Sequence, residues 1–147
     1  MSVDVVVNST KNATAMIDNG CCTYSLICEK LVQQLNLPRF AISATKLVMV
    51  GEKTSSVQEV TEFEIDVGGV KRKIAAYIVP STYEFDIILG KTWLEDVDGV
   101  VYAAEHRLDL RRYQISIRSR EGTPALWFNC ATITASTFQL YVRRSKK

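Results

Sequence analysis

The strongest constraint on the fold of this chain is a short apolar run that ends in an acid and a glycine. Ala15, Met16 and Ile17 lead directly into Asp18-Asn19-Gly20. Such a run is typical of a strand, and a glycine without a Cβ lets the backbone fold back closely beneath the acid. A second apolar run, residues 85–90, also ends in a glycine and precedes a segment that predicts a short helix. The order of strand, acid and glycine occurs only once in the chain.

Length and composition predict one mainly β domain. The 147 residues suffice for an ordinary core, and the strand-forming residues Val, Ile, Thr and Tyr are frequent. The net charge of +2 hides an asymmetry: residues 1–100 carry 9 basic and 13 acidic side chains (net −4), and residues 101–147 carry 9 and 3 (net +6). A basic end can contact nucleic acid or a membrane surface, but we expect the commoner case of a solvated end or a linker.

The cysteines and the one histidine exclude the usual metal and disulfide frameworks. Cys21, Cys22, Cys28 and Cys130 form no Cys-x-x-Cys pair and His106 is alone, so no zinc site of ordinary spacing can be drawn. We expect reduced thiols, with Cys21 and Cys22 buried and structural. No segment has the pattern of a signal peptide, and none approaches a membrane span. These features predict an intracellular protein without membrane contact.

Hydrophobic periodicity and turn residues predict the order of the elements. We expect strands over residues 3–7, 14–17, 46–50, 57–67, 71–79, 86–89, 108–110 and 113–117, and helices from residue 25 and over 92–97. Asn36 and Pro38 end the first helix. The strand 71–79 is expected to pair with 86–89. Past Arg120 the pattern weakens, and residues 132–142 are either one more strand or an unfolded connector.

A lone aspartate in a tight turn is a poor catalyst at neutral pH, because its ordinary pKa is about 4. Two carboxylates about 3 Å apart share one proton, so that one acts as a base and the other as an acid on a bound water. Asp96 and Asp98 lie near Gly99 but follow a helix-like stretch. The second carboxylate would therefore be Asp18 of another copy. The simpler alternative is that Asp18 only caps backbone amides of its own turn.

Three segments carry a resemblance to a known family. They are Ala15-Met16-Ile17-Asp18-Asn19-Gly20-Cys21, Glu29-Lys30-Leu31-Val32-Gln33-Gln34-Leu35-Asn36-Leu37 and Tyr83-Glu84-Phe85-Asp86-Ile87-Ile88-Leu89-Gly90-Lys91-Thr92-Trp93-Leu94. In this order and spacing they resemble the protease (retropepsin) segment of Ty3/Gypsy-type LTR retrotransposon polyproteins, most closely a fungal Asp-Asn-Gly form. The resemblance implies a mostly β, retropepsin-like closed barrel, the acid protease fold, with one or two short helices. The protease domain would span residues 1–120, and residues 121–147 would form a C-terminal extension or polyprotein connector.

The resemblance also implies a function: a homodimeric aspartic endopeptidase, with one Asp-x-Gly turn per subunit, that cleaves Gag-Pol polyprotein. Asp18 would be catalytic, with Asn19 and Gly20 completing the active-site turn. A flap over the substrate would comprise Val50, Gly51, Glu52 and Lys53, and the dyad would be supported by Ile88, Leu89 and Gly90. No metal or organic cofactor is implied. The partners would be a second copy and extended peptide segments of its own polyprotein, in the cytoplasm and within virus-like particles.

The chain departs from the family pattern at two places. Asn19 stands where the family has Ser or Thr, and the flap tip has a single glycine, Gly51. Asn also offers a donor and an acceptor, so pairing across the dimer remains chemically feasible. The alternative is a catalytically weak or inactive retropepsin-like module that dimerises or binds peptides. Asp86 would either assist the dyad or, as we expect, act as a capping or ion-pair partner of Lys91 or of an arginine in the late strands.

Overall fold

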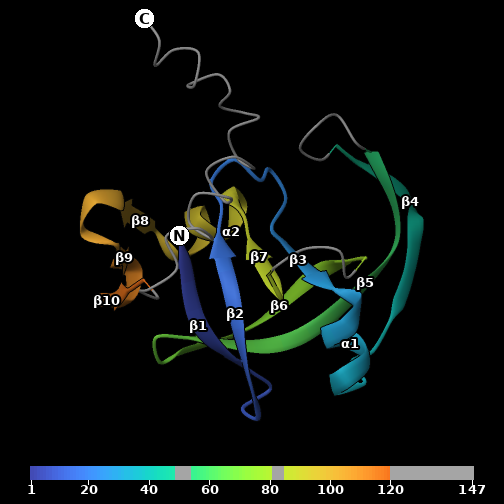
Figure 1. Cartoon of the computed structure of the whole chain (residues 1–147), viewed down its shortest axis with the longest axis horizontal. Helices are drawn as coiled ribbons and strands as arrows, with labels where there is room; N and C mark the ends of the chain where they lie inside the picture. Colours follow the sequence, from blue (N-terminus) through green and yellow to red (C-terminus); the bar gives the residue numbers. More distant parts are fainter. Residues whose placement is uncertain (49–53, 81–84, 120–147) are drawn as a thin grey trace, which may run out of the picture.

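The computed structural model describes residues 1–48, 54–80 and 85–119, so the predicted flap residues and everything after Ser119 lie outside the described residues. The described chain is mostly β with two short α-helices, which confirms the predicted fold class (Figure 1). The strands are β1 Ser2–Val7, β2 Lys11–Ile17, β3 Ser25–Cys28, β4 Phe40–Val48, β5 Thr54–Val67, β6 Val70–Val79, β7 Ile87–Leu89, β8 Gly99–Tyr102, β9 Arg107–Leu110 and β10 Ile115–Arg118. The helices are α1 Glu29–Leu35 and α2 Lys91–Val97, with the short 3-10 turns η2 Ala103–Glu105 and η3 Arg111–Tyr113.

Six strands close into a barrel. Their hydrogen-bonded order is β1-β2-β7-β3-β6-β5, and β1 pairs back with β5 through Val6↔Asp66 and Val7↔Ile65. The first half of β5 extends beyond the barrel and pairs with β4, which forms the outer edge of the sheet. Figure 1 shows β4 on one side of the barrel and the separate sheet of β8, β9 and β10 on the other. Closure buries the alternating apolar residues of β1 and β5 inside the barrel.

The pairing of β2 with β7 joins the two sequence segments that carry the family resemblance. The two strands are parallel, with Ala15↔Ile87 and Ile17↔Leu89 opposite each other. Because both run in the same direction, the Asp18 turn and Gly90 emerge at the same end of the sheet. The fold thereby brings together residues that lie far apart in the sequence.

Two expectations about this sheet were wrong. Residues 25–28 form β3 and not the first turn of a helix, and α1 begins at Glu29. All four residues of β3 are buried, and a strand buried on both faces is a continuous apolar run that periodicity cannot distinguish from helix. β6 pairs with β5 and β3 instead of the strand over 86–89, because β3 lies between β6 and β7.

The ends of α1 and the late strands agree with the sequence. Asn36 caps α1 in the left-handed conformation (φ 50°, ψ 48°), and Pro38 follows two residues later. The helix therefore ends where the sequence predicted. β9 and β10 correspond to the two predicted late strands. β8, which pairs with β9, was missed, because none of its four residues is fully buried and the apolar alternation is therefore weak.

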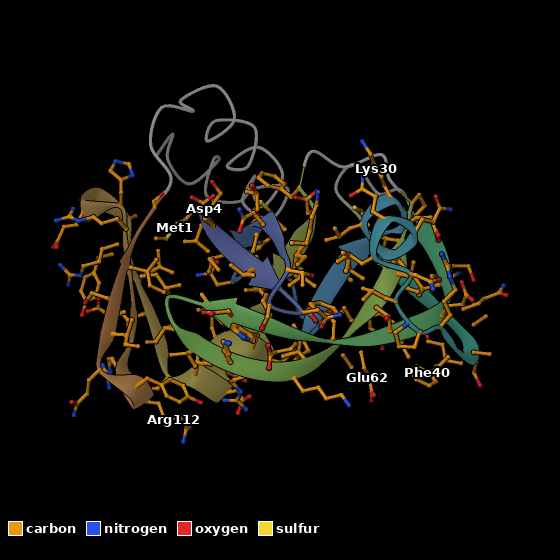
Figure 2. All side chains as sticks on the ribbon, turned by 90° about the horizontal axis from the view of Figure 1, so that it is seen from below. Met1, Asp4, Lys30, Phe40, Glu62 and Arg112 are labelled. Atoms are coloured by element: carbon orange, nitrogen blue, oxygen red, sulfur yellow. The ribbon has the colours of Figure 1, made fainter. Side chains whose placement is uncertain are left out.

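The described side chains place few large apolar groups on the surface. Phe40, at the start of the edge strand β4, is the one large hydrophobic residue among them with substantial exposure (46%), and Figure 2 shows it at the rim of the molecule. Trp93 of α2 is packed in the main core with Leu31, Phe63 and Leu108. None of the described helices has the length and hydrophobicity that a membrane span requires.

One buried hydroxyl predicts a stabilising substitution. Thr61 of β5 is 0% exposed, and within the described residues its Oγ1 is the buried side-chain polar atom that lacks a hydrogen-bond partner. Thr61→Val keeps the shape and removes the unpaired hydroxyl, so we expect the free energy of unfolding in urea to rise by about 1 kcal/mol. The matched control is Ser25→Ala: Ser25 is 1% exposed and its Oγ donates to Ala75 O at 2.6 Å, so its loss should destabilise by about 1 kcal/mol. Equal effects of the two substitutions would contradict this assignment.

Candidate active site

The Asp18 turn is fixed by backbone hydrogen bonds to β7 and within itself. Asp18 N donates to Leu89 O at 2.9 Å, which continues the β2–β7 pairing past the end of β2. Cys21 N donates to Asp18 O at 3.1 Å and closes the turn. Gly20 N donates to Asp18 Oδ1 at 2.9 Å, so the carboxylate also has the turn-capping contact of the simpler alternative. The position of the acid is therefore determined by three hydrogen bonds that need no particular partner side chain.

Asp18 is almost entirely buried, with 7% of its surface exposed. Desolvation raises the pKa of its carboxyl, and the hydrogen bond from the Gly20 amide opposes this shift only in part. A carboxyl group with a raised pKa retains its proton to a higher pH than an ordinary aspartate. This property suits a group that must both accept and donate a proton.

Gly90 lies directly behind this turn. A Cβ at this position would overlap the carbonyl oxygen of Thr23 and lie 2.8 Å from that of Cys21. The φ of Gly90 is −94°, so the glycine is needed for space and not for an unusual backbone conformation. Gly90 N donates to Tyr24 O at 2.9 Å, and Lys91 N donates to Cys21 O at 2.8 Å. The segment after the turn is thereby held against the start of α2.

The three residues predicted to support the acid lie in different environments. Leu89 accepts the amide of Asp18 and its side chain is in the main core, and Gly90 backs the turn. Ile88 points to the opposite face of β7, where it is half-buried and packs against Met16 and Phe85. It also borders a second apolar cluster on this face, formed by Leu26, Leu47, Val57 and Val79. Met16 is two residues before Asp18 and therefore on the same face of the chain, so Ile88, Met16 and Phe85 form an apolar cluster near the acid, of which Met16 and Phe85 were not predicted.

The other predicted site residues are only partly placed. Asn19 and Gly20 are exposed at the tip of the turn. The predicted flap, from Val50 to Lys53, lies outside the described residues. The strands on either side of it are described, and Val48↔Thr54 is their last pair before that segment.

Asp86 accepts a backbone amide, in line with the capping role that was one of the two expected alternatives, but its partner is not Lys91. Its Oδ2 accepts the backbone amide of Thr14 at 3.0 Å, so the residue just before β7 holds the middle of β2. Lys91, one of the expected ion-pair partners, lies instead near Glu95 of its own helix at 3.5 Å. Asp86 therefore joins the two strands that carry the site.

The cysteines near the turn differ in burial. Cys28 is buried and Cys21 half-buried, but Cys22 is exposed, so the prediction of two buried thiols after the turn was wrong for Cys22. The Sγ of Cys21 lies 3.2 Å from Thr23 Oγ1, and burial raises the pKa of its thiol, which disfavours the nucleophilic thiolate. Across the described residues no group of three or more His, Cys, Asp and Glu side chains is placed to hold a metal ion.

A cleft of about 630 Å³ begins where the turn ends. It opens where the pairing of β4 with β5 is interrupted between Ala41 and Thr45. Its walls come from the segment after the turn, the first residue of β3, and β4, β5 and β6: Cys22, Thr23, Tyr24, Ser25, Ile42, Ser43, Thr45, Val60, Ala75, Ala76 and Tyr77. The lining contains no Asp, Glu, Lys, Arg or His, so the cleft suits neutral groups.

A closed six-stranded barrel that holds one buried Asp-x-Gly turn against a parallel strand, with a glycine and a helix behind it, defines a retropepsin-like protease domain. The comparison with family models names the family. Residues 14–119 match the PEG10/RTL1 protease domain, so the chain belongs to this retropepsin-like family, which derives from Ty3/Gypsy elements. The matched range contains both the Asp18 turn and the segment around Gly90.

Solved structures share the fold. The retroviral protease-like domain of Ddi1 from Leishmania major superposes with a TM-score of 0.58 at 13% sequence identity, over 84% of this chain and 96% of that domain. The EIAV protease, solved with the inhibitor HBY-793, superposes with a TM-score of 0.50 at 19% identity, over 67% of this chain and 88% of that protease. No curated protein matches the sequence. At these identities the two structures establish the fold alone.

Proposed function

We propose that this chain is an aspartic endopeptidase that works as a homodimer. The observation that carries the proposal is the buried Asp18, held by its own turn and by Leu89 O, with a pKa raised by desolvation. A group of this kind is suited to proton transfer, but one carboxyl cannot act as acid and base at the same moment.

The second carboxyl has no source within the described part of the subunit. Asp96 and Asp98, at the end of α2, are held by Arg72 at 2.7 Å and by Arg111 at 3.2 Å. Asp86 is occupied by the Thr14 amide. A two-fold axis through the turn supplies the missing group, because it places Asp18 of the partner opposite Asp18 of the first subunit.

The proposed reaction needs only this pair and a water molecule. The ionised Asp18 takes a proton from the water, whose oxygen forms a bond to the peptide carbonyl carbon. The protonated Asp18 of the other subunit donates to the carbonyl oxygen. The C–N bond then breaks as the leaving nitrogen takes the proton that the first Asp18 received from the water. The other Asp18 removes a proton from a hydroxyl of the tetrahedral diol, whose oxygen re-forms the carbonyl, and the pair again holds one shared proton.

The surroundings of Asp18 favour an extended peptide with apolar side chains near the cleaved bond. Ile88 is the partly exposed member of the apolar cluster near the acid and is backed by the buried Met16 and Phe85, and the uncharged cleft accommodates neutral residues further along the peptide. We propose that the natural substrate is the Gag-Pol type polyprotein to which a fungal-like Ty3/Gypsy protease segment would belong, cleaved in the cytoplasm and within virus-like particles. In the same proposal, residues 1–120 form the enzyme and residues 121–147 a connector.

A second candidate is a non-catalytic module on the same fold that dimerises or binds peptides. It is favoured by Asn19, which stands at the exposed tip of the turn where the family has Ser or Thr. It is also favoured by the bond from Gly20 N to Asp18 Oδ1, which gives the acid a purely structural role.

The concentration dependence of cleavage tests the dimeric enzyme. A peptide library analysed by mass spectrometry first identifies cleaved sequences, and a labelled peptide then gives rates. Below the dissociation constant of the dimer we expect the initial rate to rise with the square of the protein concentration. An excess of the Asp18→Asn chain should inhibit by forming mixed dimers with a single ionisable Asp18. Rates proportional to concentration where sedimentation finds only monomers, with no inhibition by the variant, would contradict the proposal.

A further inference from the structure

Tyr24 links the segment after the Asp18 turn, residues 21–24, to the far end of α2. Its hydroxyl donates to Asp96 Oδ2 at 2.9 Å. The same oxygen is 2.7 Å from Arg72 Nη2 of β6, and Arg72 Nη1 donates to the hydroxyl of Tyr113 at 2.7 Å. Arg112 Nε donates to Asp96 O at 2.8 Å, so Asp96 is held through both its side chain and its backbone. We call Tyr24, Asp96 and Arg72 the tyrosine–aspartate network; Tyr113 contacts Arg72 and lies outside it.

The backbone of the same segment rests on the other end of α2. Gly90 N, Lys91 N and Thr92 Oγ1 donate to the carbonyl oxygens of residues 24, 21 and 22, at 2.9, 2.8 and 3.4 Å. The first residues of α2 therefore hold the backbone of the segment, and the last turn of α2 holds the segment through the contact of Asp96 with Tyr24. Gly90 and Asp96 are six residues apart, which corresponds to about 9 Å along a helix axis.

α2 is itself rigidly placed. Trp93, Leu94 and Val97 are buried in the main core, and the ring of Tyr24 packs against the same core. Burial and the bond to Asp96 raise the pKa of Tyr24 to about 12, so its hydroxyl stays protonated and remains a donor over any working pH. The ion pair with Arg72 compensates the charge of the half-buried Asp96.

We propose that Tyr24 and Asp96 are positioning residues for Asp18. Through the tyrosine–aspartate network, α2 holds the segment that follows the catalytic turn in a fixed position. The inference rests on the proposed function. The segment is connected to the acid directly, because Cys21 N closes the Asp18 turn while Cys21 O is held by Lys91 N. If Tyr24 is released from Asp96, the segment loses its attachment to the end of α2, and the shared-proton geometry of the two Asp18 groups loosens.

Paired substitutions test this role. Tyr24→Phe removes only the hydroxyl that joins the segment to Asp96, and the control Tyr113→Phe removes a tyrosine hydroxyl that contacts Arg72 outside the network. Asp96→Ala is matched by Glu95→Ala, which removes the neighbouring carboxylate of α2, whose contact with Lys91 is exposed. We expect Tyr24→Phe and Asp96→Ala to lower kcat by about tenfold or more, with KM within about twofold and a shifted pH profile of kcat. Tyr113→Phe and Glu95→Ala should leave kcat within about twofold.

A second readout needs no enzymatic activity. Amide hydrogen exchange at Cys21, Gly90 and Lys91 reports the closure of the turn and its docking on α2. We expect exchange at these amides to accelerate by about tenfold in Tyr24→Phe and Asp96→Ala, and to change little in the two control variants. If the unaltered dimer cleaves no peptide, the proposed function fails, and the exchange rates still decide whether the network positions the turn. Unchanged exchange in Tyr24→Phe, or equal changes in Tyr24→Phe and Tyr113→Phe, would overturn the inference.

Discussion

Asp18→Asn is expected to abolish peptide cleavage, with a loss in kcat of about 10⁴-fold or more. Asparagine has nearly the same size as aspartate, and its Oδ1 still accepts the hydrogen bond from Gly20 N, so the turn should keep its shape. The asparagine side chain cannot take a proton from water or share one with the partner subunit. The loss should therefore appear in kcat, while sedimentation shows an unchanged dimer.

The same variant has a second, pH-dependent expectation. The folded chain raises the pKa of Asp18 above its ordinary value of 3.8, so the folded state binds this proton more tightly than the unfolded state. As the pH rises above the ordinary pKa of 3.8, ionisation of Asp18 lowers the free energy of unfolding. This loss of stability is complete once the pH exceeds the pKa of Asp18 in the folded state. Asp18→Asn should increase the free energy of unfolding near neutral pH and change it little below the ordinary pKa. Urea titrations at both pH values measure the difference.

Asp86→Asn is the matched control for this experiment. Asp86 is a second aspartate beside β2, half-buried where Asp18 is buried, and its Oδ2 accepts a backbone amide, which asparagine can preserve. We expect cleavage by Asp86→Asn within about threefold of the unaltered chain, since its contact is a single hydrogen bond far weaker than a catalytic role. If Asp18→Asn keeps its activity, or if both variants lose it equally, Asp18 is not the catalytic acid. A peptide-binding module would retain its binding in Asp18→Asn.

Gly90→Ala is expected to produce the largest loss of stability. Its Cβ would overlap the carbonyl oxygen of Thr23 and approach that of Cys21, and both are backbone atoms that cannot rotate away. Either β7 and α2 must move back or the segment after the turn must move forward. We expect the free energy of unfolding to fall by about 3 kcal/mol. Cleavage should fall at least a hundredfold, because a shift of about 1 Å at the acid is enough for that loss.

Gly99→Ala is the control for Gly90→Ala. The Cβ at Gly99 would meet Leu94 Cδ2 at 2.7 Å, which is the end of a flexible side chain. We expect a loss of about 1 kcal/mol and near-normal cleavage, because the contact lies at the far end of α2. Chemical denaturation and peptide cleavage of the two variants are measured together. Equal behaviour of the two variants would mean that the space behind the Asp18 turn is not restricted.

The sequence alone was sufficient for those features that depend on neighbouring residues. The apolar run before Asp18, the glycines at positions 20 and 90 and the end of α1 at Asn36 are each encoded within a few residues. These local signals, together with the resemblance that they carry, predicted the fold class and the retropepsin-like family. The resemblance also predicted that Gly90 would lie close to the acid. The residues around Gly90 do not, however, show by themselves which strand β7 pairs with.

Tertiary structure decided everything that depends on which distant segments pair. β3 is a strand because it fills the gap between β6 and β7, whereas its apolar residues alone fit a helix equally well. Asp86 meets Thr14, and Tyr24 meets Asp96, only because β2 and β7 run side by side and bring α2 behind the turn. The physical reason is that local propensity acts over a few bonds, while strand pairing, burial and charge contacts depend on closure of the whole barrel.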